Sequence, residues 1–242
     1  MLGSIYHTVI ALSLLASSIS IFYTKKEEKQ IHGLILVTLV WVLLFESFGL
    51  ITARKGINNS LLYNISWVYI ESLILIGYFY LLEKNPLFRK RIIYISAVIL
   101  VWGLFNSLYL QPIALTLQYF SVTPFGVFII VLSIRLLRNI LNLELYPDHN
   151  LLVIPHFWIS STILFFFIES LTLFGTYQFN PGFVVENVGI LFGFNKFIAG
   201  LMYFFFGTSF IFPHLSKNPK NLKTGLVFLL LISNISFIFL SI

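Results

Sequence analysis

The segment Gly56 to Leu82 reads GINNSLLYNISWVYIESLILIGYFYLL, and its apolar part from Leu61 to Leu82 decides the fold class. An α-helix needs about 20 apolar residues to cross the hydrocarbon core of a bilayer, and this run has that length. A strand of a transmembrane barrel would alternate apolar and polar residues over about 10 positions, which this run does not do. The segment therefore predicts a membrane-spanning helix.

The composition of the whole chain agrees with a membrane location. Of its 242 residues, 58% are hydrophobic and 10% are charged, and the mean hydropathy is +0.94. Soluble domains have about 25% charged residues, so an ordinary soluble enzyme is excluded. The chain has no cysteine, which excludes a disulfide framework and cysteine-based metal or thiolate chemistry.

Similar apolar runs recur along the chain, separated by segments that contain lysine, arginine, asparagine, proline or glycine. At about 20 residues for each span, we expect an all-α polytopic transmembrane bundle of about eight helices, seven plus a shorter C-terminal one. They form one integral membrane domain over residues 1–242. The predicted spans are Ser4 to Tyr23, Ile31 to Thr52, Leu61 to Leu82, Ile92 to Leu110, Ile113 to Leu136, Leu151 to Thr176, Val185 to Phe212 and Gly225 to Ile242.

Positive charges are distributed unevenly among the predicted loops. The first, third, fifth and seventh loops hold most of the 15 lysines and arginines, whereas the second has Arg54 and Lys55 and the fourth and sixth have none. Because loops rich in these residues stay in the cytoplasm, we expect both termini on the outer side of a bacterial inner membrane. The net charge of +6 is thus a topology signal, and no nucleic-acid partner is expected. The cations of the four loops are Lys25, Lys26, Lys29; Lys84, Arg89, Lys90, Arg91; Arg135, Arg138; Lys217, Lys220 and Lys223.

Four ionisable residues lie inside predicted spans, namely Glu46, Glu71, Glu169 and Lys196. An unpaired charge at the bilayer centre opposes insertion by at least about 2.5 kcal/mol, so each should face protein or water. Counting 1.5 Å per helical residue places Glu71 and Lys196 near the midplane and the other two about 7 Å outward. Asn106 joins them in the outer half, so we predict a ligand or ion site there.

Helical spacing indicates the direction of two of these side chains. Lys196 shares a face with Gly189, Gly193, Gly200, Tyr203 and Gly207, and small residues mark close helix packing, so Lys196 is expected to point inward. Glu169 lies on a stripe of mixed polar and aromatic residues and is also expected to point inward. The pair Gly189-x-x-x-Gly193 could pack within the bundle or join two chains in a homo-oligomer.

The segment at Gly56 to Leu82 resembles a set of small multi-helix membrane proteins of Bacteroidota. Asn106, the H-F-W-I segment at His156 to Ile159, and Asn195 are similar to the same set. Related segments occur as sensory modules beside or fused to histidine kinases, so the resemblance implies a histidine kinase as a partner. It also implies a shared structural or sensing core, to which Lys196 does not belong. The core residues are Asn59, Tyr63, Asn64, Glu71, Asn106, Phe157 and Trp158.

These features leave several functions open. The first is a receptor-like or accessory membrane protein that detects a small molecule, lipid or membrane state in the outer-half site and signals to a partner. The second is a small proton- or ion-coupled transporter, which intramembrane carboxylates and the Pro124 kink favour. A structural interpretation also stands, in which the charges are buried pairs that fix helix register.

Two minor alternatives involve chemistry. An intramembrane enzyme acting on lipid could use Glu169 as a general base, but no nucleophile motif accompanies it, so no catalytic residue is assigned. An opsin-like protein could bind retinal on Lys196 with Glu71 as counterion, although Phe192 stands where many microbial opsins carry an acid. No other cofactor is expected. The histidines lack paired ligand spacing, so no metal site is predicted.

Overall fold

The computed structural model describes residues 2–142 and 150–215, and all regular structure in these ranges is helical. Six helices are long and apolar enough to cross a membrane, which agrees with the predicted polytopic bundle. The predicted eighth span, Gly225 to Ile242, lies outside the described residues. These six are α2 (Lys29–Arg54), α5 (Pro86–Tyr109), α6 (Tyr119–Leu141), α7 (Pro155–Phe179), α9 (Val188–Thr208) with the turns that follow it to His214, and the third span, which joins α3 (Ser60–Tyr63), η1 (Asn64–Glu71) and α4 (Ser72–Leu82). The first predicted span forms α1 (Leu2–Ser20), whose apolar stretch Ile5–Ser20 is shorter than these. The short elements are η2 (Leu151–Val153), α8 (Pro181–Glu186), η3 (Ser209–Ile211) and α10 (Phe212–Leu215).

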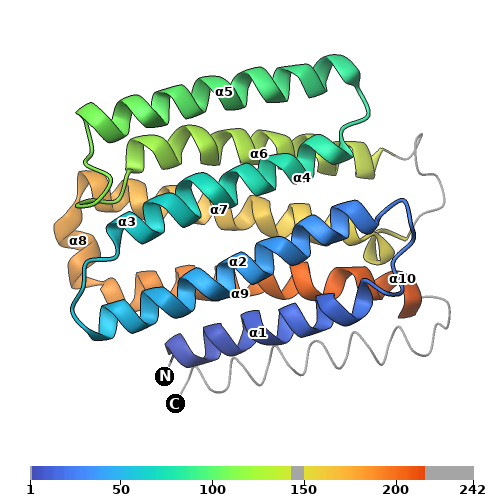
Figure 1. The fold of residues 1–242 in the computed structure, drawn as a ribbon, viewed down its shortest axis with the longest axis horizontal. Helices are drawn as coiled ribbons and strands as arrows, with labels where there is room; N and C mark the ends of the chain where they lie inside the picture. Colours follow the sequence, from blue (N-terminus) through green and yellow to red (C-terminus); the bar gives the residue numbers. More distant parts are fainter. Residues whose placement is uncertain (1, 143–149, 216–242) are drawn as a thin grey trace.

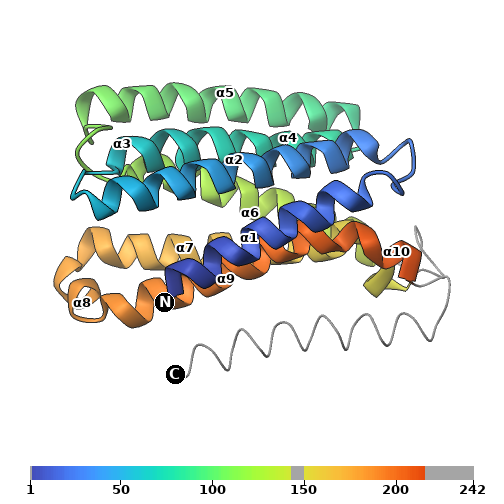
Figure 2. The same cartoon turned by 60° about the horizontal axis from the view of Figure 1, so that its bottom comes forward.

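Successive long helices run in opposite directions, so the bundle is antiparallel (Figure 1). The turned view shows α5 on one side and α1, α7 and α9 on the other, with α2, α3, α4 and α6 between them (Figure 2). Aliphatic and aromatic side chains from several helices form the core, including Leu39 on α2, Ile129 on α6, Ile163 on α7 and Phe206 on α9, which are fully buried. Gly207 lets α9 approach α1 closely, because a Cβ on it would lie 2.4 Å from the carbonyl oxygen of Ser13.

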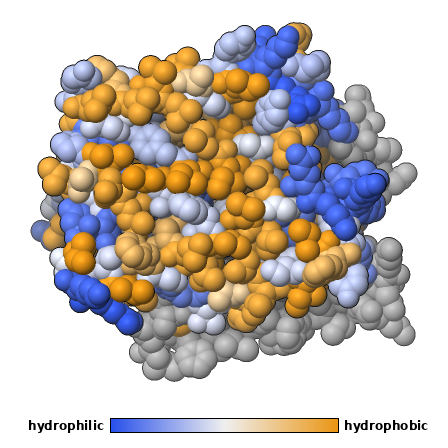
Figure 3. All heavy atoms as spheres, viewed as in Figure 1, coloured by the Kyte–Doolittle hydropathy of each residue, from blue (hydrophilic) through white to orange (hydrophobic). Residues whose placement is uncertain are grey.

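The loops at the two ends of the bundle differ in charge. The connections α1–α2 and α4–α5 lie at the end where α10 lies, and the other end carries the α2–α3 and α5–α6 connections and α8 (Figure 1). Hydrophilic side chains gather at the α10 end in the face that Figure 3 shows, beside a largely hydrophobic middle. We call the end where α10 lies the basic end, and the end where α8 lies the open end. The cations predicted for the first, third and fifth loops thus gather at one end, whereas those of the seventh, Lys217, Lys220 and Lys223, lie outside the described residues. Which end faces the cytoplasm stays a prediction.

Local signals explain the ends of several helices. Asn85 caps α5, because its side chain accepts bonds from the backbone amides of Leu87 and Phe88, and Pro86 occupies the first turn. The helix therefore begins at Pro86, six residues before the predicted start at Ile92. At the end of α2, Gly56 has a φ of 69°, a left-handed conformation that favours glycine and stops the helix.

Two predicted spans begin later than expected. The fifth span was predicted from Ile113, but α6 begins at Tyr119, because side-chain amides hold residues 110–118 in a loop. The seventh span was predicted from Val185, but the chain breaks at Asn187 between α8 and α9. Neither break shows in the hydropathy of the sequence.

The third span is continuous but not uniform. Residues Asn64–Glu71 form a π-helix, whose wider turn changes the direction of every side chain that follows it. Such turns are rare and concentrate at functional sites. This one includes Trp67 and ends at Glu71, so it sets which way both side chains point.

The predicted mid-helix Pro124 lies inside α6, which continues through it. Proline removes the amide that would bond to the carbonyl four residues earlier, here Phe120. That carbonyl instead accepts a 2.7 Å bond from the indole of Trp102 on α5. An unpaired carbonyl in lipid costs several kcal/mol, so Trp102 offsets the loss.

Candidate ligand-binding site

A cavity of about 640 Å³ lies between the helices near the open end. Its mouth is formed by polar residues of the two end loops, and its depth reaches Ala199 and Tyr203 on α9. A volume of this size is in the range of small-molecule sites, which run from about 300 to 1,000 Å³. The lining residues are Tyr6, Phe45, Glu46, Asn58, Asn59, Ser60, Tyr63, Trp67, Leu115, Thr116, Leu117, Tyr119, Phe166, Phe174, Tyr177, Gln178, Phe192, Asn195, Lys196, Ala199 and Tyr203.

Glu46 on α2 lines this cavity and is held by two phenols. Tyr6 on α1 donates to its Oε1 at 3.2 Å, and Tyr63 at the end of α3 donates to its Oε2 at 3.1 Å. Gly49, one turn from Glu46, leaves the space for Tyr63, because a Cβ there would lie 2.8 Å from the phenol oxygen. The three helices thus fix the carboxylate in one position.

Lys196 also lines the cavity, but its setting differs from the prediction. It is exposed, and no ion pair within 4.0 Å joins it to Glu46. The two groups are still near enough to interact electrostatically. The described part of the span runs Val188–His214, which places Lys196 about five residues outward of its middle, or about 7 Å. Lys196 thus lies farther from the middle of its described span than of the predicted one, and its depth in the bilayer stays a prediction.

The glycine face predicted around Lys196 divides along the helix. Its inner part packs against α1, where Gly207 approaches Ser13 and Gly200 approaches Tyr6. At the outer end, a Cβ on Gly189 would meet nothing within 4 Å. Gly189 therefore makes no close packing contact within the described bundle, and a role in joining two chains stays a prediction.

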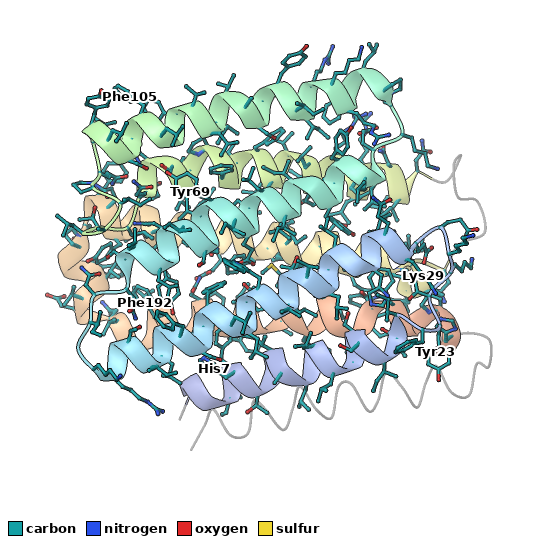
Figure 4. All side chains as sticks on the ribbon, in the orientation of Figure 1. His7, Tyr23, Lys29, Tyr69, Phe105 and Phe192 are labelled. Carbon is teal, nitrogen blue, oxygen red and sulfur yellow. The ribbon has the colours of Figure 1, made fainter. Side chains whose placement is uncertain are left out.

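An aromatic surface forms another part of the wall. Trp67 packs against Phe174 with ring centroids 5.1 Å apart and against Phe166 at 6.3 Å, and Phe174 meets Phe192 at 6.1 Å. Figure 4 shows Phe192 toward the open end, far from Tyr23 and Lys29 at the basic end. The rings come from η1, α7 and α9, so tertiary packing assembles this surface.

Glu71 lies behind the cavity wall, in contact with Tyr203. Its side chain is 1% exposed and does not line the space, but Tyr203 on α9 does, and its phenol donates to Glu71 Oε1 at 2.8 Å. Glu71 Oε2 has no hydrogen-bond partner in the described structure. Glu71 therefore reaches the cavity only through Tyr203 and does not contact Lys196, its counterion in the opsin interpretation.

Glu169 on α7 likewise stands behind the wall. It is half-buried, and Asn195, which does line the cavity, donates to its Oε2 at 2.6 Å and to Ser170 Oγ at 3.2 Å. The carboxylate thus orients Asn195 rather than facing the space itself. Glu169 was predicted to point inward. It contacts Asn195 on α9, but its carboxylate does not line the cavity.

The predicted asparagines have separate local tasks. Asn64 is fully buried and donates at 2.7 Å to the carbonyls of Ile113 and Thr116, while its Oδ1 accepts from the Gln118 amide at 3.0 Å. Asn106 is also fully buried and donates to Ser121 Oγ at 2.8 Å. Neither lines the cavity, and both secure the loop that forms part of its mouth.

Asn59 does line the cavity, near its mouth. Its Nδ2 donates to the carbonyl of Gly49 at 2.8 Å, and its Oδ1 accepts from Thr52 at 2.5 Å. These bonds fasten the α2–α3 connection to the last turns of α2. Asn59 therefore shapes the mouth with both ends of its amide already occupied by protein.

Phe157 and Trp158 lie near the start of α7, at the basic end of the bundle, and do not line the cavity. The Trp158 ring stacks on Phe205 at 4.7 Å, and its indole donates to the Leu152 carbonyl. The proposed sensing core of the resemblance is therefore split between the two ends of the bundle. The fold does not bring these two residues to Tyr63 or Glu46.

Sequence reasoning missed a histidine cluster near the basic end. Buried His32 stacks on Phe210 at 4.0 Å and binds Thr24 at 2.7 Å, and His156 binds the Tyr78 phenol at 3.0 Å. In the described ranges, no group of three or more histidine, aspartate or glutamate residues could hold a metal ion. The histidines come from different helices, so no spacing along the chain indicated the cluster.

Sequence reasoning also missed Tyr6 and Asn195 as cavity residues. Tyr6 lies near the start of α1, where a tyrosine usually meets the membrane interface, and Asn195 was noted only through the resemblance. Tyr203 was recognised only as a member of the Lys196 face. Each of the three side chains bonds a carboxylate on another helix, and such a contact can be recognised only when the packing of the helices is known.

No protein-family model, curated protein or solved structure matches this chain.

Proposed function

We propose that this protein is a receptor-like membrane protein that binds a small molecule in the cavity at the open end. The observation that most supports ligand binding is the cavity of about 640 Å³, whose lining includes a fixed carboxylate, a lysine and an aromatic surface. Concave, mostly apolar spaces with a few convergent polar groups are the usual form of ligand sites.

The closed floor favours reception over transport. Past Tyr203, the chain continues into Phe206 on α9 and Phe210 on η3, which are at most 2% exposed, and His32 lies against Phe210 with no exposed surface. A packed core therefore fills the bundle between the cavity and the basic end. A transporter is the second candidate, and it needs this core to open on the other side.

A signal would leave through a partner protein. The resemblance to modules that stand beside histidine kinases supports such a partner, and the basic end is the side where we place the contact. This part of the proposal depends on the predicted orientation, in which the basic end faces the cytoplasm.

Because the chain has no cysteine, a single introduced cysteine can report whether a reagent reaches the cavity from either side of the membrane. Ala199→Cys places one thiol at the floor of the cavity, and Ile163→Cys places a control thiol in the core, where Ile163 is fully buried. We expect a membrane-impermeant methanethiosulfonate to label Ala199→Cys only from the open-end side of sealed vesicles. The control should not react.

The three outcomes separate the candidates. Labelling from one side supports reception, and labelling from both sides replaces it with the transporter. A thiol at Ala199 that reacts from neither side, like the control, contradicts both, because no molecule then reaches the cavity.

A further inference from the structure

The cavity has two charged lining residues, and their charges are opposite. Glu46 is negative, Lys196 is positive, and the mouth is lined by neutral polar residues such as Asn58, Thr116 and Gln178. The formal charge of the lining is therefore zero. A ligand with a net charge would leave one of the two groups facing a like charge, whereas a zwitterion satisfies both.

Glu46 retains the capacity to bind a cation. A carboxylate offers about four lone-pair positions, and the phenols of Tyr6 and Tyr63 occupy one on each oxygen. The two bonds also hold the carboxylate still, so a ligand does not have to order it on binding. Tyr6 is 8% exposed, which indicates that this arrangement is part of the packed wall.

Lys196 retains its own donors. No carboxylate in the described structure lies within 4.0 Å of its ammonium, and an ammonium can donate three hydrogen bonds. Its position on α9, one turn outward of Ala199, places it between the floor and the mouth. It is therefore available to an anionic group of a ligand.

Aromatic rings complete the recognition of a cation. The wall includes Phe45 and Tyr63, with ring centroids 5.8 Å apart, and Trp67. Aromatic faces attract organic cations by about 0.5 to 2 kcal/mol, and quaternary ammonium groups are recognised in this way. The combination of rings with a carboxylate suits an alkylated amine better than a metal ion, which would need more oxygen ligands.

We propose that the ligand is a small zwitterion with an amine or quaternary ammonium group and a phosphate or carboxylate group. The cationic group binds Glu46 and the surrounding rings, and the anionic group binds Lys196. The inference rests on the proposed function, since it names the class of molecule that the receptor site takes. A free solute and a lipid headgroup share this chemistry.

The test uses the full chain in nanodiscs of phosphatidylglycerol, a lipid without a zwitterionic headgroup. Phosphocholine and glycine betaine serve as soluble zwitterions, and choline and inorganic phosphate serve as half-ligands, with binding measured by calorimetry. We expect at least one zwitterion to bind about tenfold or more tightly than either half-ligand. Two zwitterions that bind no better than the half-ligands would overturn the proposal.

Two variants assign the charges. Glu46→Gln should weaken binding of the zwitterion and of choline about tenfold and leave phosphate unchanged, and Lys196→Met should weaken the zwitterion and phosphate and leave choline unchanged. The exposed residues Glu27 and Lys90, outside the cavity, supply the matched controls Glu27→Gln and Lys90→Met, which should bind as the natural chain does. Equal binding by all four variants contradicts the assignment. Thermal unfolding without ligand checks that each variant is folded.

A second series distinguishes the source. In nanodiscs that contain phosphatidylcholine, occupation by a headgroup should raise the melting temperature of the natural chain and reduce the apparent affinity for soluble zwitterion, whereas a free solute should bind equally in both lipids. The Ala199→Cys labelling separates the two proposals. If the thiol reacts but no zwitterion in either form binds, the ligand class is wrong and the receptor site stands.

Discussion

The phenol of Tyr203 donates a 2.8 Å hydrogen bond to Glu71 Oε1 and also lines the floor of the cavity. A fully buried carboxyl thus touches the cavity through one side chain that lies 132 positions away in the sequence. The other oxygen of Glu71 has no partner in the described structure, so Tyr203 carries its hydrogen bonding alone.

Removing this phenol should therefore destabilise the fold. We expect Tyr203→Phe to lower the free energy of unfolding by about 1 to 3 kcal/mol, because both oxygens of a buried carboxyl then lack partners. Fluorescence-detected thermal unfolding in detergent measures the change. Adding Glu71→Leu should recover part of the loss, and a double variant that is less stable than the sum of the single variants would contradict this account.

Asn64 is expected to control the shape of the mouth. Asn64→Ala removes bonds to two carbonyls and one amide of the α5–α6 loop, and at about 1 kcal/mol each the loss is roughly 3 kcal/mol. Limited proteolysis should then cut between residues 110 and 118. Asn58→Ala is the control, because the side chain of Asn58 makes one exposed 3.4 Å bond to the α5–α6 loop, at the Leu115 carbonyl, and its other bond, from the Ser60 amide, lies outside that loop. It should change the cleavage rate little.

Trp102 and Pro124 should be energetically coupled. Trp102→Phe leaves the carbonyl of Phe120 without its 2.7 Å donor, which should cost about 1 to 3 kcal/mol. In a Pro124→Ala background the restored amide can bond to that carbonyl, so the same substitution should cost less. A double-mutant cycle of thermal unfolding measures the difference, and equal costs in both backgrounds would show that the indole is not compensating for proline.

The close contact of α1 with α9 predicts a strong effect of one added methyl group. Gly207→Ala places a Cβ about 2.4 Å from the Ser13 carbonyl oxygen, so the helices must separate, at a cost of about 1 to 3 kcal/mol. Gly189→Ala on the same helix meets nothing within 4 Å and should be neutral or stabilising by up to about 1 kcal/mol. Melting temperatures of the two variants that fall equally would sink this explanation.

The ion pair at the basic end predicts a pH dependence. Burial raises the pKa of Glu83, but the 2.5 Å bond from Arg135 and nearby backbone bonds outweigh this effect and hold the pKa below the ordinary value of a glutamate. A lowered folded-state pKa stabilises the fold above the unfolded value, and this stabilisation is lost as the pH falls through the folded value. Melting temperatures between pH 7 and pH 3 should therefore fall less for Glu83→Gln than for the natural chain. Parallel curves would remove Glu83 as a cause.

Much of the fold was predictable because membrane insertion acts on short stretches of sequence. Each span must bury about 20 apolar residues, so the runs that contain Leu39, Ile129 and Ile163 marked helices without any knowledge of their neighbours. Loop charges likewise indicated which connections share an end. The loop before Tyr119 escaped prediction, because the bonds that hold it come from Asn64 on another helix.

The candidate site was predictable only in part. Depth along a helix drew attention to Glu46 and Lys196, which the packing brings to one cavity. It could not separate them from Glu71, Glu169 and Asn106, which stand behind the wall or secure a loop. Helical periodicity gives the direction of a side chain relative to its own helix and says nothing about the rotation of that helix in the bundle.

The sequence by itself determined the membrane environment, the helical class and the charge difference between the two ends, since these depend on local hydropathy and charge. The tertiary structure alone decided which polar groups meet. Tyr6, Glu46 and Tyr63 come together from three helices, and Tyr203 reaches Glu71 across the bundle. The reason is that a cavity is the space left by the packing of several helices, and that packing depends on side-chain shapes at long sequence separation.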